Sequence, residues 1–175
     1  MKIILFILIS TVTFGQNLSF APNITKQNGI ETPNLYAKHY VGAQTAFTID
    51  IKLSKTFAIT TGGQIAFNRY GWLQQTRNTI DGEINGDIEQ VKYFCSVGLP
   101  VLVKISANKN LSASFGGLGI FSPIRSEMIN PLSFSAIATV QYKSIFIQYA
   151  YGLSEIERNA TTKINSIALG FAFKL

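Results

Sequence analysis

Apolar and polar residues alternate through most of this sequence, and this period of two constrains the fold more than any other feature. In residues 40–53 the odd positions carry most of the bulky apolar side chains, and the even positions are mainly small or polar. Such alternation predicts β-strands that present one face of each kind. Eight segments show it, at residues 17–26, 40–53, 56–70, 90–105, 109–122, 131–142, 145–153 and 163–175.

The connections between these segments are long and short in turn. The short ones are residues 54–55, 106–108 and 143–144, and the long ones are 27–38, 71–88, 123–130 and 154–162. In an up-and-down meander this order places every long loop at the same end, as in bacterial outer-membrane barrels. We therefore predict an all-β fold, an eight-stranded antiparallel up-and-down transmembrane β-barrel.

The two faces of the predicted strands differ in size as well as in polarity. The bulky face includes Phe47, Val97 and Leu169, whereas the opposite face is mostly Gly, Ala, Ser, Thr, Gln and Asn. A soluble lipocalin-like barrel, the main structural alternative, points its large apolar residues inward and covers its outside with charges. Small uncharged residues suit the narrow interior of an eight-stranded barrel, so we expect the bulky face to contact lipid.

Aromatic residues fall near the predicted strand ends, where a membrane-interface girdle is expected. On the long-loop side they are Tyr40, Phe67, Tyr70, Trp72 and Tyr151, and beside the short turns they are Phe57, Tyr142 and Phe173.

Composition agrees with a single, unusually apolar domain. The chain has 175 residues, of which 14% are charged and 12% are aromatic, and it is too apolar for a disordered protein. The 15 Lys and Arg residues outnumber the 9 Asp and Glu residues, but they form no basic stripe interleaved with aromatics. Nucleic acid is therefore not an expected partner.

The first 15 residues are predicted to be an export signal. Lys2 supplies a positive start, residues 3–12 form a short apolar run, and Thr13 and Gly15 are small residues where a signal peptidase reads. We expect cleavage before Gln16, which leaves residues 16–175 as the barrel. The destination is then the bacterial outer membrane, with both termini in the periplasm.

Two prolines lie within predicted strands. Pro100 interrupts the segment at 90–105, and Pro22 lies in the segment at 17–26, the weakest of the eight and the one needed to close the ring. Proline has no N–H and removes one ladder hydrogen bond. The register points Pro100 inward, where a bulge or a polar lumen side chain can absorb that loss.

Four stretches resemble a known family. They are VGLPVLVKI (97–105), LSASFGGLGIF (111–121), FIQYAYGLSEI (146–156) and ALGFAFKL (168–175). This pattern, from about residue 40 to the C-terminus, is similar to the PorT-like outer-membrane β-barrel domain family. The resemblance implies a membrane barrel and a role in the cell envelope or in secretion, and it implies hardly any chemistry.

Few residues indicate catalysis or metal binding. Cys95 and His39 are each the single residue of their type, whereas a zinc site needs three or four ligands at recognisable spacings. The carboxylates around residues 80–88 lack the spacing of a calcium loop and are typical of a solvated hairpin tip. We expect no cofactor, no metal site and no catalytic residue.

The candidate binding residues are basic and lie on the long-loop side. They are Lys38, Arg69, Arg77, Arg125 and Arg158. Such side chains can contact lipopolysaccharide phosphates through charge-assisted hydrogen bonds, or they can simply keep the loops soluble.

These features predict a non-enzymatic scaffold or surface-binding protein whose partners are outer-membrane lipids and the barrel-insertion machinery. The sequence identifies no protein partner. The alternatives are a lipid A-modifying enzyme that uses His39 with a serine, and the soluble carrier. A pore is disfavoured, because polar side chains would fill the interior. These are Gln44, Asp50, Gln64, Lys92 and Gln148.

Overall fold

The computed structural model describes residues 14–28, 35–77, 84–123, 130–155 and 163–175. Their strands are β1 (Phe14–Asn28), β2 (Leu35–Ala37), β3 (His39–Lys52), β4 (Phe57–Arg77), β5 (Ile84–Ser106), β6 (Leu111–Phe121), β7 (Leu132–Tyr142), β8 (Ile145–Gly152) and β9 (Lys163–Lys174). The described residues include no helix long and apolar enough to cross a membrane.

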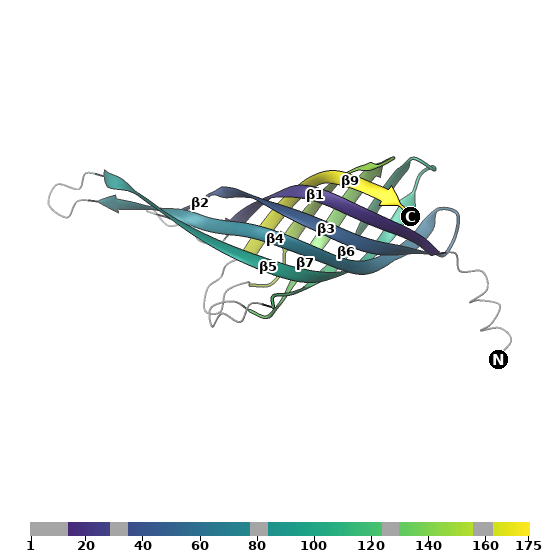
Figure 1. Cartoon of the computed structure of the whole chain (residues 1–175), viewed down its shortest axis with the longest axis horizontal. Helices are drawn as coiled ribbons and strands as arrows, with labels where there is room; N and C mark the ends of the chain where they lie inside the picture. Colours follow the sequence, from purple (N-terminus) through teal and green to yellow (C-terminus); the bar gives the residue numbers. More distant parts are fainter. Residues whose placement is uncertain (1–13, 29–34, 78–83, 124–129, 156–162) are drawn as a thin grey trace.

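The strands form one antiparallel sheet that closes on itself (Figure 1). Strand β1 pairs with β3 on one side and with β9 on the other, and β4 pairs with β5. Because β2 and β3 pair with the same edge of β4, they act as two parts of one strand, and the described ring has eight members. The predicted all-β, up-and-down arrangement of eight strands is confirmed.

The weak first strand is present and longer than predicted. It extends from Phe14 to Asn28, and its pairing with both β3 and β9 is what closes the ring. Phe14 and Gly15, the last residues of the predicted signal, pair with Ile51 and Asp50. Residues 1–13 lie outside the described part of the chain, so cleavage before Gln16 stays a prediction.

The predicted loop at 71–88 is wrong over most of its length. Strands β4 and β5 stay paired well past the predicted strand ends, as far as Thr76 with Gly86 and, after a register shift, Arg77 with Ile84. This hairpin projects beyond the rest of the barrel (Figure 1). Backbone pairing continues there although the side-chain alternation weakens, because the ladder itself does not require one buried face.

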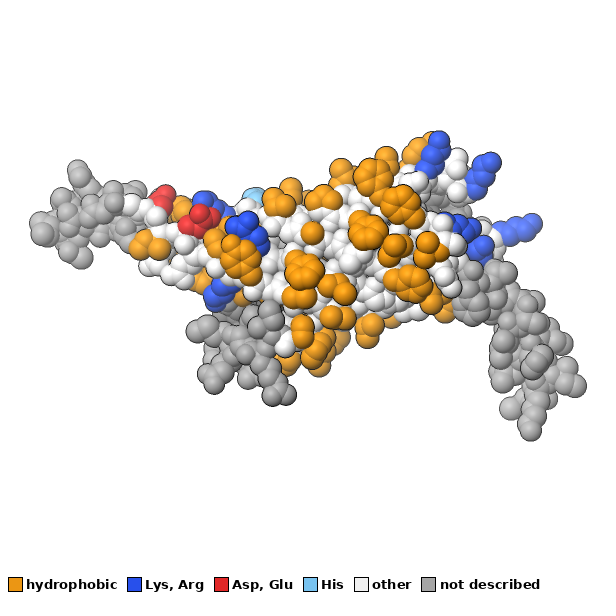
Figure 2. Space-filling model, viewed as in Figure 1, with side chains coloured by type: hydrophobic (Ala, Val, Ile, Leu, Met, Phe, Trp, Pro, Cys, Tyr) orange, Lys and Arg blue, Asp and Glu red, His pale blue; other side chains and the backbone are white. Residues whose placement is uncertain are grey.

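The orientation of the two faces agrees with the prediction. Leu169 on the outer face is 59% exposed, whereas its neighbour Ala168 is 1% exposed. Apolar side chains are spread over the visible barrel wall in Figure 2, and the strongest concentrations of charge lie toward its two ends. Small and polar residues occupy the interior, among them Thr60, Ser96 and Ser135.

Pro100 points inward as predicted, but no bulge accommodates it. The β4–β5 ladder runs from Phe57 to Thr61, misses the pairs opposite Pro100 and Leu99, and resumes at Gln64 in the same register. On its other side Pro100 pairs with Leu118 of β6. The residue facing Pro100 is Gly62, at a φ of +153° that side chains disfavour.

Pro22 lies beside a similar gap, although it is exposed on the outer face and the residue opposite it is Leu169. The β1–β9 ladder has pairs at Phe20 and Asn23 but none between them, and this gap faces Gly170 and Leu169. A Cβ at Gly170 would lie 2.2 Å from the carbonyl oxygen of Phe20. Pro100 and Pro22 thus each lie at a two-pair gap in one ladder, and a glycine on the neighbouring strand lies within each gap, opposite Pro100 in the first and opposite Ala21 in the second.

We expect Gly62→Ala to destabilise the barrel by about 1–3 kcal/mol, because the backbone conformation is unfavourable for alanine. Its Cβ would also lie 2.1 Å from the carbonyl oxygen of Phe47. The measurement is urea unfolding of the folded barrel in detergent. Gly63→Ala is the matched control, since a Cβ at Gly63 meets nothing within 4 Å. Equal losses in the two variants would contradict this explanation.

Candidate functional site

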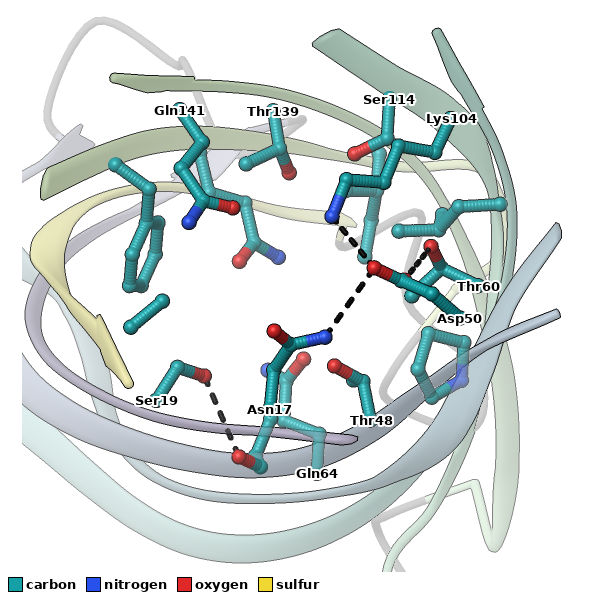
Figure 3. Close-up of a pocket in the computed structure, with 17 residues that line it drawn as sticks. Asn17, Ser19, Thr48, Asp50, Thr60, Gln64, Lys104, Ser114, Thr139 and Gln141 are labelled. Atoms are coloured by element: carbon teal, nitrogen blue, oxygen red, sulfur yellow. Dashed lines mark hydrogen bonds and ion pairs between the residues drawn. The ribbon is translucent and has the colours of Figure 1, made fainter. Parts of the chain in front are cut away.

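A charged network occupies the interior of the barrel near the short turns (Figure 3). The Nζ of Lys104 on β5 lies 2.7 Å from Oδ2 of Asp50 on β3. The Thr60 hydroxyl donates to Oδ1 of Asp50 at 2.6 Å, and Asn17 Nδ2 donates to Oδ2 at 3.3 Å. Three neighbouring or nearby strands, β1, β4 and β5, therefore supply hydrogen bonds or charge to the Asp50 carboxylate on β3, as a buried ion requires.

Three glutamines cross the middle of the barrel. Gln64 Nε2 donates to Gln44 Oε1 at 3.1 Å, and Gln44 Nε2 donates to Gln148 Oε1 at 3.0 Å. Gln44 lies on β3 and Gln148 on β8, which are not neighbours in the ring, so the second bond spans the lumen. The interior at this level is filled by side chains, as predicted.

Beyond the glutamines, toward the long loops, aromatic packing closes the interior. Tyr70 is 0% exposed, and its ring meets that of Phe94 edge to face with centroids 5.7 Å apart. Ile164 completes this buried cluster. Lys92 pairs with Tyr70 on the same strand ladder, and its ammonium lies 5.1 Å from the centroid of the Trp72 ring.

A polar cavity of about 80 Å³ remains beside the charged network. Ser19, Thr48, Ser114 and Thr139 line it from four different strands and turn their hydroxyl groups toward it (Figure 3). It shares Asp50 and Lys104 with a wider cavity at the short-turn end. The polar cavity and the wider cavity therefore adjoin each other at the short-turn end of the interior.

At the long-loop end, two of the predicted basic residues gather around Glu89. Lys38 Nζ lies 3.4 Å from Glu89 Oε1, and the Tyr40 hydroxyl donates to the same oxygen at 3.0 Å. The Arg69 guanidinium lies over the Tyr93 and Tyr40 rings, 5.1 and 5.8 Å from their centroids. The hydrogen bond from Tyr40 lowers the pKa of Glu89, with smaller help from Lys38 and Arg69, and outweighs the opposing desolvation.

An apolar groove on the outer wall includes Arg69 in its lining. Its volume is about 510 Å³, and Val41, Phe67, Tyr93 and Cys95 line it. The groove follows an irregularity in the sheet, since the β2–β4 ladder ends at Ala37 with Trp72 and the β3–β4 ladder begins at Ala43 with Phe67. Across this break the Thr25 hydroxyl bonds the carbonyl oxygens of Tyr40 and Arg69.

Of the three remaining predicted contacts, the structure describes only the backbone of Arg77. Arg77 is the last residue of β4, where it pairs with Ile84 at the end of the projecting hairpin. Arg125 and Arg158 lie outside the described residues. Only Lys38 and Arg69 are therefore brought together by the described structure.

The catalytic and metal hypotheses gain no support from the described residues. His39 is exposed and pairs with Lys26 of β1, and none of the described contacts joins it to a serine or a carboxylate. No group of three or more His, Cys, Asp and Glu residues in the described ranges could hold a metal ion. Of the carboxylates around residues 80–88, Asp81 and Glu83 lie outside those ranges.

The sequence did not predict two contacts, the ion pair of Asp50 with Lys104 and the ion pair of Glu89 with Lys38. Asp50 and Lys104 both fall at even positions, which form the inward face of their strands in the alternating pattern. This shared face is the sequence signal from which their ion pair could have been predicted. No sequence signal joins Glu89 to Lys38, because the long hairpin that carries Glu89 was predicted as a loop.

Comparison with solved structures supports the fold. Ail, the attachment invasion locus protein of Yersinia pestis, solved in complex with the heparin analogue sucrose octasulfate, matches with a TM-score of 0.50 and 16% identity over 91% of this chain and 99% of that chain. A second structure of Ail gives 0.45 and 13% over 91% and 98%. The NanC porin gives 0.33 and 12% over 92% and 100%. At these identities the first match shows the barrel fold alone.

No family model matches the sequence, and no curated protein matches it. The resemblance to the PorT-like family therefore stays a prediction.

We expect Lys104→Met to lower the free energy of unfolding by about 3–5 kcal/mol, because it leaves the charge of Asp50 buried without its ion-pair partner. Urea unfolding in detergent measures the loss. The control is the double variant Asp50→Leu with Lys104→Met, which removes both charges and should recover most of the stability. A double variant as unstable as the single one would show that packing, not charge, sets the cost.

Proposed function

We propose that this chain is an integral outer-membrane β-barrel with a non-enzymatic, surface-binding role. The observation that carries the location is the belt of bulky apolar side chains on the outside of a closed ring. Residues of this belt include Val97, Val101, Phe115, Ile147 and Leu169. The fold likeness to Ail, a small outer-membrane barrel, supports the same location.

Energetics favours lipid over water around this belt. Leaving a Leu, Ile or Phe side chain in water instead of an apolar medium costs about 1.5–3 kcal/mol for each residue. Closure of the ring also gives the wall strands backbone partners without open sheet edges, as hydrocarbon requires. A soluble carrier needs the reverse orientation, with its large apolar side chains inside.

Outward aromatic residues near both ends of the barrel support the same reading. Phe57, Tyr142 and Phe173 are exposed beside the short turns, and Phe67 and Tyr151 are exposed toward the long loops. Tyr rings at such positions suit the boundary between lipid and headgroups. The prediction is wrong for two residues of the girdle, because Tyr40 and Tyr70 are buried and not exposed on the outer face.

We expect Leu169→Arg to prevent assembly of the barrel in the membrane. A charge on the lipid-facing wall near the midplane costs about 2–4 kcal/mol. The measurement is heat-modifiable migration of the membrane-extracted protein on a gel, with Leu169→Phe as the apolar control.

A soluble barrel would behave differently in the same assay. It would be released without detergent, and Leu169→Arg would leave its folding unchanged or improved. Either result would overturn the proposed location.

The surface-binding role rests on the groove at Arg69. A guanidinium beside an otherwise apolar groove suits an amphiphile with an anionic headgroup and acyl chains, because the charge can bind the headgroup and the apolar lining can contact the chains. Lipid A of the outer leaflet is the occupant we propose. That a barrel of this fold accepts anionic ligands is illustrated by Ail in its complex with sucrose octasulfate.

We expect Arg69→Gln to reduce the lipid A that co-purifies with the barrel by about fivefold, since one charge-assisted contact is worth roughly 1 kcal/mol or more. Mass spectrometry of the extracted lipid measures both its amount and its structure. His39→Ala is the matched variant on the same side, and it should change neither.

Two outcomes would contradict this role. Equal lipid in Arg69→Gln and the wild type would remove Arg69 from binding. An altered lipid A structure in both a deletion strain and His39→Ala would favour the alternative, a lipid A-modifying enzyme. The insertion machinery as a partner and a periplasmic position of both termini follow from the barrel proposal.

A further inference from the structure

The short-turn end of the barrel is a basic vestibule. We use this name for the cavity of about 720 Å³ at that end, into which the turns after β3, β5 and β7 converge. Six lysines line it: Lys52, Lys55, Lys104, Lys109, Lys143 and Lys174. Figure 2 shows blue side chains gathered at this end of the molecule.

Three of these lysines belong to the inward face of the wall. Ala58, which is buried, pairs with Lys52 on one side and with Lys104 on the other, so both lysines lie on the same inner surface as Ala58. Lys174 pairs with Asn17, whose side chain bonds Asp50 inside the barrel. Directly paired residues of an antiparallel sheet point to the same face.

The vestibule holds little negative charge to balance them. Asp50 is the single carboxylate among its described lining residues, and it is already bonded to Lys104, Thr60 and Asn17. The other five lysines line the same cavity, and no carboxylate besides Asp50 is among its described lining residues. Like charges in one cleft concentrate the field there and attract anions from solution.

Size and position favour a soluble ligand over the lipid leaflet. A water molecule takes about 30 Å³ of liquid volume, so the vestibule has room for a compact polyanion of many atoms. Membrane phosphates lie around the outside of a barrel, where inward Lys52 and Lys174 do not point. Lys143, by contrast, has its Nζ 5.6 Å from the centroid of the exposed Tyr142 ring.

We propose that the vestibule is a binding site for a soluble phosphate-bearing anion that enters from the short-turn end. Inward Lys52 and Lys174 supply the charge that faces the ligand, and Lys55 and Lys109 on the turns attract it to the mouth. The glutamine crossing and the buried cluster of Tyr70, Phe94 and Ile164 occupy the interior beyond Asp50, and the proposed site is accordingly a pocket and not a conduction path. The proposal does not depend on lipid binding at Arg69.

The test uses the purified folded barrel in a neutral detergent, with inorganic tripolyphosphate as the probe and isothermal titration calorimetry as the measurement. The variant Lys52→Gln with Lys174→Gln should weaken binding by at least about tenfold, because two facing charges are lost. The matched control removes two lysines at the opposite end, Lys26→Gln with Lys163→Gln, and should stay within about twofold. The single variants at Lys52 and Lys174 should give intermediate losses, which keeps the test decisive if the double variant folds poorly.

Salt should weaken binding strongly, because raising the ionic strength from about 0.01 M to 0.15 M shortens the Debye length from about 30 Å to about 8 Å. An equal loss in the control pair would overturn the proposal, since the effect would then reflect overall charge. Repeating the titration in nanodiscs distinguishes the source of the phosphate. Phosphatidylglycerol that abolishes tripolyphosphate binding, where phosphatidylcholine does not, would assign the lysines to lipid headgroups and overturn the soluble site.

Discussion

The pairing of β1 with both β3 and β9 is the constraint on which the rest of the structure depends. An antiparallel sheet with two open edges leaves rows of N–H and C=O groups that hydrocarbon cannot satisfy. The first strand removes both edges at once. Only a closed ring has an inside, so the lumen network, the glutamine crossing and the basic vestibule all follow from this closure.

The ring also explains the two prolines. Each proline removes a hydrogen bond from one ladder only. In both places that ladder has a gap of two pairs, and a glycine lies within the gap. The flanking pairs keep their register, so the alternation of faces is preserved on either side. A bulge would have changed the register and turned the following side chains to the wrong face.

The two ends of the barrel have different electrostatics. At the long-loop end Lys38 forms an ion pair with Glu89, and the Arg69 guanidinium lies over the rings of Tyr93 and Tyr40. At the short-turn end Asp50 is satisfied within the wall, and most of the lysines face open space. One end thus presents a compact charged and aromatic surface, and the other presents a positively charged cavity.

The sequence by itself determined the strands, their up-and-down order and the direction of each face, because a period of two and the lengths of the connections are local properties. It also placed Asp50, Gln44, Gln64 and Gln148 inside. The length of the β4–β5 hairpin, the ladder gaps, the contact of Lys38 with Glu89 and the gathering of six lysines around one cavity were decided by the tertiary structure. These features join residues far apart in the chain, and only the register and curvature of the closed ring bring them together.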